Sequence, residues 1–248
     1  MSAGAEADDG LLGQAVAAHG GSDRFDTVSE IAVRLSAGGL AFASRFAGRA
    51  LRDVLARVST AEPTTIFEPY PRQGRQGTFE GDRVRIVSAG GDTVAARSEP
   101  RAAFTSLRRK VAWDDLDLLY FAGYALWNYL TAPFLLARPG FESREGEPWL
   151  ENGERWRRLH VRFPDGIATH SRDQTFYFDA NGVLRRLDYT AEVFGSWAKA
   201  AHYCLAYETV SGLLIPVRRR VVPRRRSGRA WPGPTLVWIR LTDIQLQT

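Results

Sequence analysis

The stretch WDDLDLLYFAGYALWNYLTAPFLL, residues Trp113 to Leu136, decides the fold. It predicts one long helix that is apolar on nearly every face, and such helices are buried. Asp114 and Asp115 favour a helix start at its first residues, and Pro133 favours an end. The run approaches the length that crosses a bilayer, but polar residues interrupt it and its aromatic residues lie mid-segment rather than in two belts at the ends. We therefore expect the helix to be buried in protein, with the rest of the chain wrapped around it.

Strand signals dominate the sequence on both sides of this helix. Asn152-Gly153 and Asn181-Gly182 lie between runs of alternating apolar and polar residues, which is the strongest short signal for a β-hairpin. Ser211-Gly212 predicts a third turn. Before the helix, a short first helix ends at Gly20-Gly21, and an alternating strand follows from Thr27 to Ser36. Together the two halves predict about ten strands of typical length.

Two further segments complete the predicted fold. Leu40 to Phe46 is predicted as a strand, whereas Val94 to Arg97 and the segment before Lys110 are expected to form a short helix that leads into the long one.

A sheet of about ten strands curls and needs something to bury its face against. We predict an α+β fold in which a curled antiparallel sheet, an open half-barrel, surrounds the long apolar helix. It would form a single domain over residues 11–248, after a disordered N-terminus of residues 1–10.

Composition narrows the function classes. The chain has 33 basic and 28 acidic residues, a net charge of +5, and one concentrated basic segment at residues 218–229. Because the charges are otherwise mixed, we expect no nucleic-acid partner.

The single Cys204 excludes an internal disulfide. The start MSAGAEADDG lacks the basic and apolar parts of a secretory signal, so we expect a cytoplasmic location.

Three segments resemble a known family, the bacterial lipoprotein-carrier superfamily of LolA, LolB and LppX-like proteins. They are the first helix with Gly20-Gly21 and its following strand, the run FYFDANGVLRRLDY at residues 176–189, and the run YETVSGLLIPVRRRV at residues 207–221. The resemblance covers about half of the chain and implies an unclosed barrel whose concave face holds an acyl chain or another hydrophobic ligand. The chain departs from the family in two ways: it shows no export signal or lipidation cysteine near its start, and its long aromatic helix is able to fill the cavity.

A line of polar residues interrupts the predicted helix. Asp117, Tyr124 and Asn128 are seven and four residues apart and so share one face. We predict a ligand site formed by these residues with Tyr120 and Trp127, because a hydrophobic pocket with a few polar anchors is typical of ligand sites. The alternative is a structural hydrogen-bond network, since tyrosines at helical spacing are most often core residues.

Candidates for catalysis and metal binding are weaker. His202 and Tyr203, beside Asp188 and Tyr189 if their strands are neighbours, offer general acid–base groups, although such pairs also stabilise sheets without catalysing anything. The chain contains no nucleophile elbow, phosphate-binding loop, dinucleotide fingerprint or HExxH motif, and we expect no cofactor.

Three histidines, His160, His170 and His202, are predicted to lie on three strands. Metal binding would require their imidazoles to converge. Alternation turns His160 away from the core, so we expect no metal site.

A basic turn offers a possible membrane contact. Arg224, Arg225 and Arg226 are predicted to lie in a turn, with Trp231 as an interfacial anchor; the alternative is a solvated hairpin with arginines paired to nearby acids.

Three function hypotheses follow. The first is binding of a hydrophobic small molecule, acyl chain or lipid between the sheet and the helix. The second is a cofactor-free cyclase or isomerase on the same scaffold, and the third is an adaptor for a membrane surface or an acidic partner.

Overall fold

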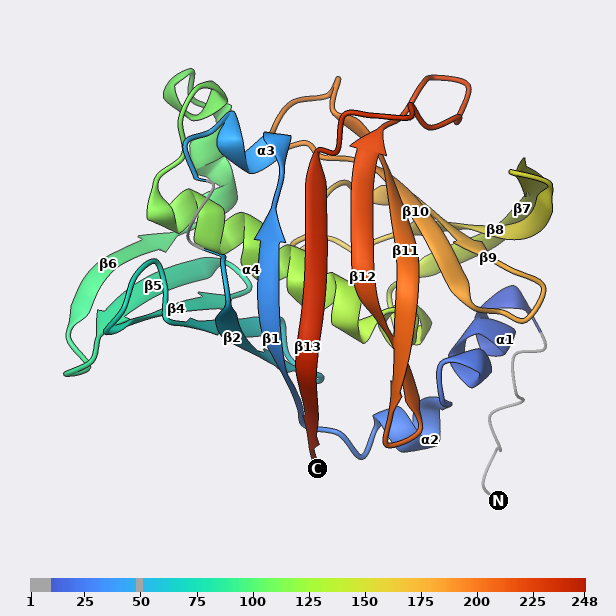
Figure 1. The fold of residues 1–248 in the computed structure, drawn as a ribbon, viewed down its shortest axis with the longest axis horizontal. Coiled ribbons are helices and arrows are strands. Elements are labelled where there is room, and N and C mark those ends of the chain that lie inside the picture. Colours follow the sequence, from blue (N-terminus) through green and yellow to red (C-terminus); the bar gives the residue numbers. More distant parts are fainter. Residues whose placement is uncertain (1–9, 48–50) are drawn as a thin grey trace.

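The computed structural model describes residues 10–47 and 51–248 of the chain (Figure 1). The prediction of a disordered N-terminus falls on residues 1–9, which lie outside the described part, and on Gly10. The described helices are α1 Leu11–Ala18, α2 Ser22–Phe25, α3 Leu40–Ala43 and α4 Asp115–Thr131, with the 3-10 helices η1 Pro100–Thr105, η2 Arg108–Lys110 and η3 Phe134–Ala137. The described strands are β1 Glu30–Gly38, β2 Val54–Ser59, β3 Thr64–Glu68, β4 Arg75–Glu80, β5 Arg83–Ser88, β6 Thr93–Ser98, β7 Glu142–Glu151, β8 Glu154–Arg162, β9 Asp173–Phe178, β10 Leu184–Thr190, β11 Lys199–Val210, β12 Leu213–Pro223 and β13 Val237–Gln247.

These strands form one antiparallel sheet in the order β6-β5-β4-β3-β2-β1-β13-β12-β11-β10-β9-β8-β7. Each half of the chain forms a meander. β1 and β13 join the two halves, with Ile31 opposite Leu246 and Leu35 opposite Leu241. The sheet curls around α4 and stays open, with β6 and β7 as its two edges (Figure 1). The predicted open half-barrel is confirmed, but it has thirteen described strands where we expected about ten.

The edge strand β6 was not predicted. Its segment was expected to lead into a helix, but Thr93–Ser98 pairs with β5 along the edge of the sheet. None of its side chains is buried. An edge strand with no buried face needs no apolar alternation, so its sequence carries no period that indicates a strand.

The long helix α4 connects the two edges of the sheet. Because β6 and β7 are consecutive in the chain but lie at opposite edges, the connection must cross the whole concave face (Figure 1). A helix of 17 residues spans about 26 Å. Every residue from Leu116 to Thr131 is buried, so the helix is covered all round, as its apolar composition predicts. Within the described ranges, no helix combines the length and apolarity that crossing a membrane requires.

Local chemistry sets both ends of α4. The Asp114 carboxylate accepts the N–H of Asp117 at 2.9 Å, and the Asp117 carboxylate accepts the N–H of Asp114 at 3.0 Å. These reciprocal bonds satisfy two N–H groups that have no partner inside the helix. At the other end α4 stops before Pro133 and the chain continues as η3. The predicted helix from Trp113 to Leu136 is therefore divided, because proline lacks an N–H and its ring clashes with the preceding turn.

The prediction of a strand from Leu40 to Phe46 is wrong, because Leu40–Ala43 forms the helix α3. β1 ends at Gly38, and the chain then passes so close to Leu236 that a Cβ on Gly39 would lie 2.4 Å from its carbonyl oxygen. Gly39 also has a φ of 130°, which favours glycine. This turn takes the chain off the sheet and places α3 over the concave face.

The backbone of α4 approaches the sheet closely at Gly123. A Cβ on this residue would lie 2.3 Å from Cβ of Phe79 on β4. The hydroxyl of Thr65 on β3 donates to the Gly123 carbonyl oxygen at 3.1 Å. The helix backbone therefore rests directly on β3 and β4, and a glycine is needed for this contact.

The variant Gly123→Ala tests this contact. Alanine in the middle of a helix is normally about 1 kcal/mol more favourable than glycine. We expect the opposite sign here, a loss of about 1–3 kcal/mol in the free energy of unfolding, because the added methyl group overlaps Phe79. Urea unfolding measures it, and Phe79→Leu should reduce the loss in the double variant. A stabilised Gly123→Ala would contradict the contact.

Candidate functional site

The interior between α4 and strands β10 and β11 contains a chain of tyrosine and histidine contacts. The Tyr124 hydroxyl lies 3.1 Å from Nδ1 of His170, and the Tyr129 hydroxyl lies 2.6 Å from its Nε2. The Tyr129 hydroxyl also lies 3.3 Å from that of Tyr189, which is 3.4 Å from Nδ1 of His202. All five side chains are buried. The chain of contacts is therefore shielded from water.

His170 is the centre of this chain. Burial, assisted by the charge of Arg101, lowers the pKa of His170 to about 3. Its ring stacks on that of Tyr189, with centroids 3.9 Å apart. Burial also raises the pKa of Tyr124 well above its ordinary value, and that of Tyr129 in the same direction. At neutral pH these groups are all uncharged, and the imidazole has one donor and one acceptor nitrogen for the two hydroxyls.

His170 lies in the loop between β8 and β9, so the prediction that it lies on a strand is wrong. Arg101 of η1 holds this loop against α4, because its guanidinium donates to the carbonyl oxygen of Thr169 at 2.7 Å. The side-chain amide of Gln174 donates to the Thr169 hydroxyl at 2.6 Å. A loop has no periodicity, so the sequence offered no signal that His170 is buried.

Two of the predicted ligand residues on α4 bond to the backbone of neighbouring segments. Asn128 donates through Nδ2 to the carbonyl oxygens of Tyr124 at 2.6 Å and Ala168 at 2.9 Å, and its Oδ1 has no partner. Trp127 donates to the Ser59 carbonyl oxygen at 3.0 Å. Both side chains thus have structural partners, and a role for them in ligand binding stays a prediction.

Asp117 and Tyr120, nearer the start of α4, also have protein partners. Asp117 pairs with Arg97 at 2.6 Å and with Arg109 at 2.8 Å. The Tyr120 ring lies 5.9 Å from that of Phe79, in an edge-on contact. The structure therefore brings Tyr124 and Asn128 into contact, whereas Asp117 belongs to a separate ion cluster at the helix start.

Three hollows follow one another along α4. A void of about 30 Å³ lies beneath α3 and is lined only by apolar and aromatic residues, among them Phe42 and Ala125. A second void of about 10 Å³ lies between α4 and the strands β9 and β10. An open groove of about 660 Å³ lies between α1 and η3. Tyr129 lines both voids, and Leu136 lines both the smaller void and the groove. The smaller void therefore adjoins the larger void at Tyr129 and the groove at Leu136.

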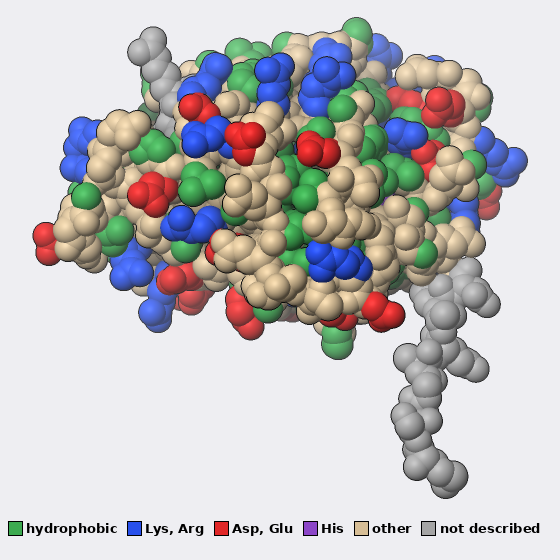
Figure 2. Space-filling view, turned by 60° about the horizontal axis from the view of Figure 1, so that its bottom comes forward, with side chains coloured by type: hydrophobic (Ala, Val, Ile, Leu, Met, Phe, Trp, Pro, Cys, Tyr) green, Lys and Arg blue, Asp and Glu red, His purple; other side chains and the backbone are tan. Residues whose placement is uncertain are grey.

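The face of the molecule shown in Figure 2 carries charges of both signs. In Figure 2, Lys and Arg side chains alternate with Asp and Glu, and apolar side chains show between them. No single sign of charge covers this face, which agrees with the near balance of 33 basic and 28 acidic residues.

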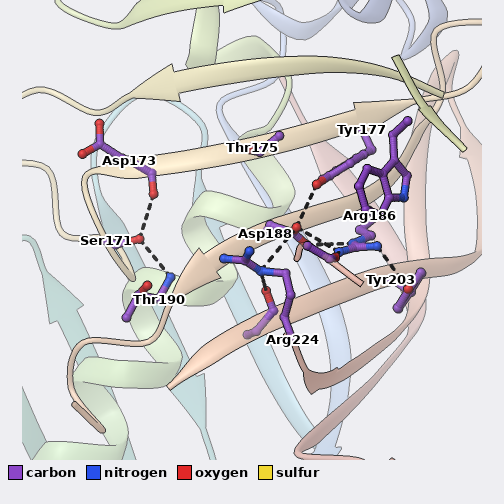
Figure 3. A network of polar contacts seen from close by, with 12 residues as sticks. Ser171, Asp173, Thr175, Tyr177, Arg186, Asp188, Thr190, Tyr203 and Arg224 are labelled. Carbon is purple, nitrogen blue, oxygen red and sulfur yellow. Dashed lines mark hydrogen bonds and ion pairs between the residues drawn. The ribbon is translucent and has the colours of Figure 1, made fainter. Parts of the chain in front are cut away.

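A second polar network lies on the outer face of the sheet, opposite α4 (Figure 3). Arg186, fully buried, donates to both carboxylate oxygens of Asp188 at 2.7 and 2.9 Å and pairs with Glu151 at 3.0 Å. The Tyr177 hydroxyl donates to Asp188 at 2.8 Å, and that of Tyr203 donates to Glu151 at 2.5 Å. The ion pairs and hydrogen bonds of this network offset the cost of burying its charges.

The four predicted catalytic residues are divided between the two faces. β10 and β11 are neighbours, with Leu187 opposite His202. Tyr189 and His202 contact each other on the inner face, whereas Asp188 and Tyr203 belong to the outer network. Successive residues of a strand point to opposite faces, so strand pairing alone does not unite them. Catalysis by these residues stays a prediction.

An open hollow of about 530 Å³ lies beside the outer network. His160 faces it, away from the core, and its Nδ1 lies 3.0 Å from the Thr175 hydroxyl. His160 is thus separated from His170 and His202 by the sheet. Among the residues that the structure describes, no cluster of three or more His, Cys, Asp or Glu is placed to hold a metal ion.

The predicted basic turn is only partly exposed. Arg224 is 18% exposed at its side chain, and its Nε lies 3.3 Å from the Asp188 carboxylate. Arg225 and Arg226 are exposed, and the Arg225 guanidinium lies 4.0 Å from the ring centroid of Trp231. Of the three arginines, Arg224 is therefore part of the outer network rather than a free surface charge.

Arg219 is an interior residue whose role the sequence did not reveal. Alternation places it on the same face as Val221, toward the core, and its side chain is 1% exposed. It donates through Nη2 to the Tyr129 carbonyl oxygen at 2.8 Å. That carbonyl has no donor within α4, because Pro133, four residues later, has no N–H.

No protein-family model matches the chain, and no curated protein sequence matches it. Solved structures do match. A LolA superfamily protein from Nitrosomonas europaea is 13% identical with a TM-score of 0.54, over 98% of this chain and 95% of that one. An outer membrane lipoprotein-sorting protein domain from Vibrio parahaemolyticus is 12% identical with a TM-score of 0.53, over 98% and 94%. A DUF1329 family protein from Desulfovibrio piger is 12% identical with a TM-score of 0.50, over 95% and 91%.

These similarities define the class of fold. The chain has the open half-barrel fold of LolA-type proteins, and the resemblance noted in the sequence is confirmed at the level of the fold.

The buried His170 predicts a pH dependence of stability. Its pKa is about 3 in the folded protein, against an ordinary value of 6.5 that applies to the unfolded chain. Between these two values the unfolded chain binds more protons than the folded protein, so the free energy of unfolding falls as the pH falls below 6.5. Within this range, each pH unit lowers the free energy of unfolding by up to about 1.4 kcal/mol. From pH 7 to pH 5, we expect His170→Gln to lose up to about 2 kcal/mol less than wild type in urea unfolding. The control His160→Gln should retain most of the wild-type loss, and an unchanged loss in His170→Gln would refute the prediction.

Proposed function

We propose that the protein binds an elongated apolar ligand of the acyl-chain type along α4. The observation that carries this proposal is a row of three spaces along α4. The open groove adjoins the smaller void at Leu136, and the smaller void adjoins the larger void beneath α3 at Tyr129. Rotation of these two side chains would join the spaces into one path. Apolar surface buried along the path would contribute about 25 cal/mol per Å² to binding.

The two voids are far smaller than an acyl chain. They measure about 10 and 30 Å³, and a space of roughly 10–15 Å³ holds a single water. Ligand entry therefore requires the interior to open. α3 has only four residues, and its Phe42 packs edge-on against Phe121 with ring centroids 5.9 Å apart. This short cover and the Tyr129 side chain are the parts that would move.

The fold supports the same class of ligand. Two of the similar structures are described as a LolA superfamily protein and a lipoprotein-sorting protein domain. At 12–13% identity they share the fold with this chain, and the ligand class comes from the apolar lining of its own voids. The cytoplasmic location expected from the N-terminal composition stays a prediction.

A neutral fluorescent probe, N-phenylnaphthylamine, tests the proposal. We expect the purified protein to bind it with enhanced emission. Ala125→Leu should weaken binding by about tenfold, because Ala125 lines the larger void and the added carbons fill it. Leu136→Ala should strengthen or accelerate binding by opening the wall to the groove. The matched control is Ala102→Leu, at an exposed residue of η1. Equal affinity of wild type and Ala125→Leu, with both folded by melting curves, would refute the path.

A second candidate function, docking to a membrane surface, is favoured by apolar side chains at one end of the molecule. Nine large apolar side chains are exposed among the described residues, and six of them lie on segments that meet at the upper end of Figure 1. We call these six the apolar rim: Leu40, Phe46, Leu107, Val111, Trp197 and Trp231.

The segments of the apolar rim contact one another. The N–H of Trp113 donates to the Arg45 carbonyl oxygen at 3.2 Å, and the Trp113 ring lies 4.6 Å from that of Phe194. The N–H of Leu40 donates to the Thr235 carbonyl oxygen at 3.3 Å. Exposed cations flank the rim at Arg108, Lys110, Arg225 and Arg226. Aromatic side chains favour the membrane interface, and cations favour anionic lipid.

Vesicle flotation tests the second function. We expect wild type to float with vesicles that contain anionic phosphatidylglycerol at low salt. The triple variant Leu107→Ser/Val111→Ser/Trp197→Ser should bind about tenfold more weakly. The matched control is Val94→Ser/Leu150→Ser/Leu205→Ser, which changes the three exposed apolar side chains outside the rim. Equal loss in both variants, or no flotation of wild type, would rule the function out.

A further inference from the structure

The Arg219 guanidinium lies in the interior of the molecule. It lies on β12 and is 1% exposed. Besides its bond to the Tyr129 carbonyl oxygen, its Nη1 lies 3.4 Å from the sulfur of Cys204, and its guanidinium lies 4.9 Å from the Tyr129 ring centroid. Its Nε is buried and has no hydrogen-bond partner. Its contacts are therefore a carbonyl, a thiol and an aromatic ring, all uncharged.

No described carboxylate forms an ion pair with Arg219. The acids on the neighbouring segments are used elsewhere, because Asp179 pairs with Arg185 at 2.7 Å and Asp188 pairs with Arg186 at 2.7 Å on the outer face. A buried charge without a counter-charge is strongly unfavourable. Capping one carbonyl oxygen needs only a neutral donor, so the cap does not account for the charge.

The unpaired charge lies at the proposed ligand path. Arg219 lines the smaller void together with Tyr129, Asn128 and His170. Among the described residues that line it, Arg219 is the one full charge, because burial lowers the pKa of His170 to about 3 and keeps it neutral. The remaining lining is apolar apart from the amide of Gln174. An apolar void with one unpaired cation fits a ligand that has an apolar body and one anion.

We infer that the apolar ligand carries a single anionic group, such as the carboxylate of a long-chain fatty acid, and that this group pairs with Arg219. The inference rests on the proposed binding function. The carboxylate accepts hydrogen bonds from the guanidinium, including its free Nε, and supplies the missing counter-charge. Charge-assisted bonds of this kind are about twice as strong as neutral ones, and more so away from water. The apolar chain then lies in the rest of the path along α4.

Competition against N-phenylnaphthylamine tests the inference with palmitic acid and its methyl ester, which share the apolar chain, whereas only the acid carries a negative charge. Wild type should bind the acid about tenfold more tightly than the ester. Arg219→Met removes the charge at similar volume and should reduce this ratio to about one while ester binding remains. Arg219→Lys keeps the charge and should retain a preference for the acid. The control Arg218→Met removes an exposed charge from the outer face of the same strand and should leave the ratio unchanged.

The outcomes separate this inference from the proposed function. Equal binding of acid and ester by wild type overturns the anionic group and leaves apolar binding intact. Binding of neither compound, nor of the probe, overturns the proposed function itself. If Arg219→Met fails to fold, the acid-to-ester ratio of Arg219→Lys and wild type still decides, because a purely structural Arg219 predicts no preference for the acid in either protein.

Discussion

The structure depends on one constraint: an apolar helix must cross the concave face of a sheet from one edge to the other. β6 and β7 are consecutive strands at opposite edges, and α4 is the connection between them. Because this helix is apolar on nearly every face, nearly all of its surface must be covered. The sheet covers most of it, and α3, η1 and the loop before β9 cover the remainder. The curl of the sheet and the placing of these short segments follow from that need.

Polar atoms inside the molecule hold α4 in place. The loop that carries His170 contacts Tyr124 and Tyr129, Asn128 bonds to the same loop, and Arg219 satisfies the carbonyl freed by Pro133. Buried polar groups without partners are costly, so these contacts select one orientation of the helix. Arg219 is the exception, since it keeps a charge that the protein leaves without a counter-charge. In the proposed function, the residue that caps α4 is therefore also the residue that binds the ligand.

The two faces of the sheet have different characters. The inner face is apolar with neutral tyrosines and histidines and the single cation of Arg219, whereas the outer face of β7–β11 carries the charged network around Arg186 and an open hollow. The open groove at α1 and the apolar rim near α3 lie at the two ends of the path along α4. This arrangement agrees with the proposed uptake of a hydrophobic molecule into the interior.

The sequence by itself determined the elements whose signals are local. The Trp113–Leu136 run has a helical composition throughout, and each Asn-Gly turn specifies its own hairpin, so the buried helix, the antiparallel order and the half-barrel class were predictable. Only the tertiary structure decided that β6 is a strand, that α3 is a helix and that His170 is buried. It also decided that Asp188 and Tyr203 lie on the opposite face of the sheet from Tyr189 and His202. Each of these depends on what lies across space: the edge of a sheet, the end of a partner strand, or the covering of α4. The unpaired charge of Arg219 belongs to the same group, because a missing counter-charge is a property of the packed interior and leaves no pattern in the chain.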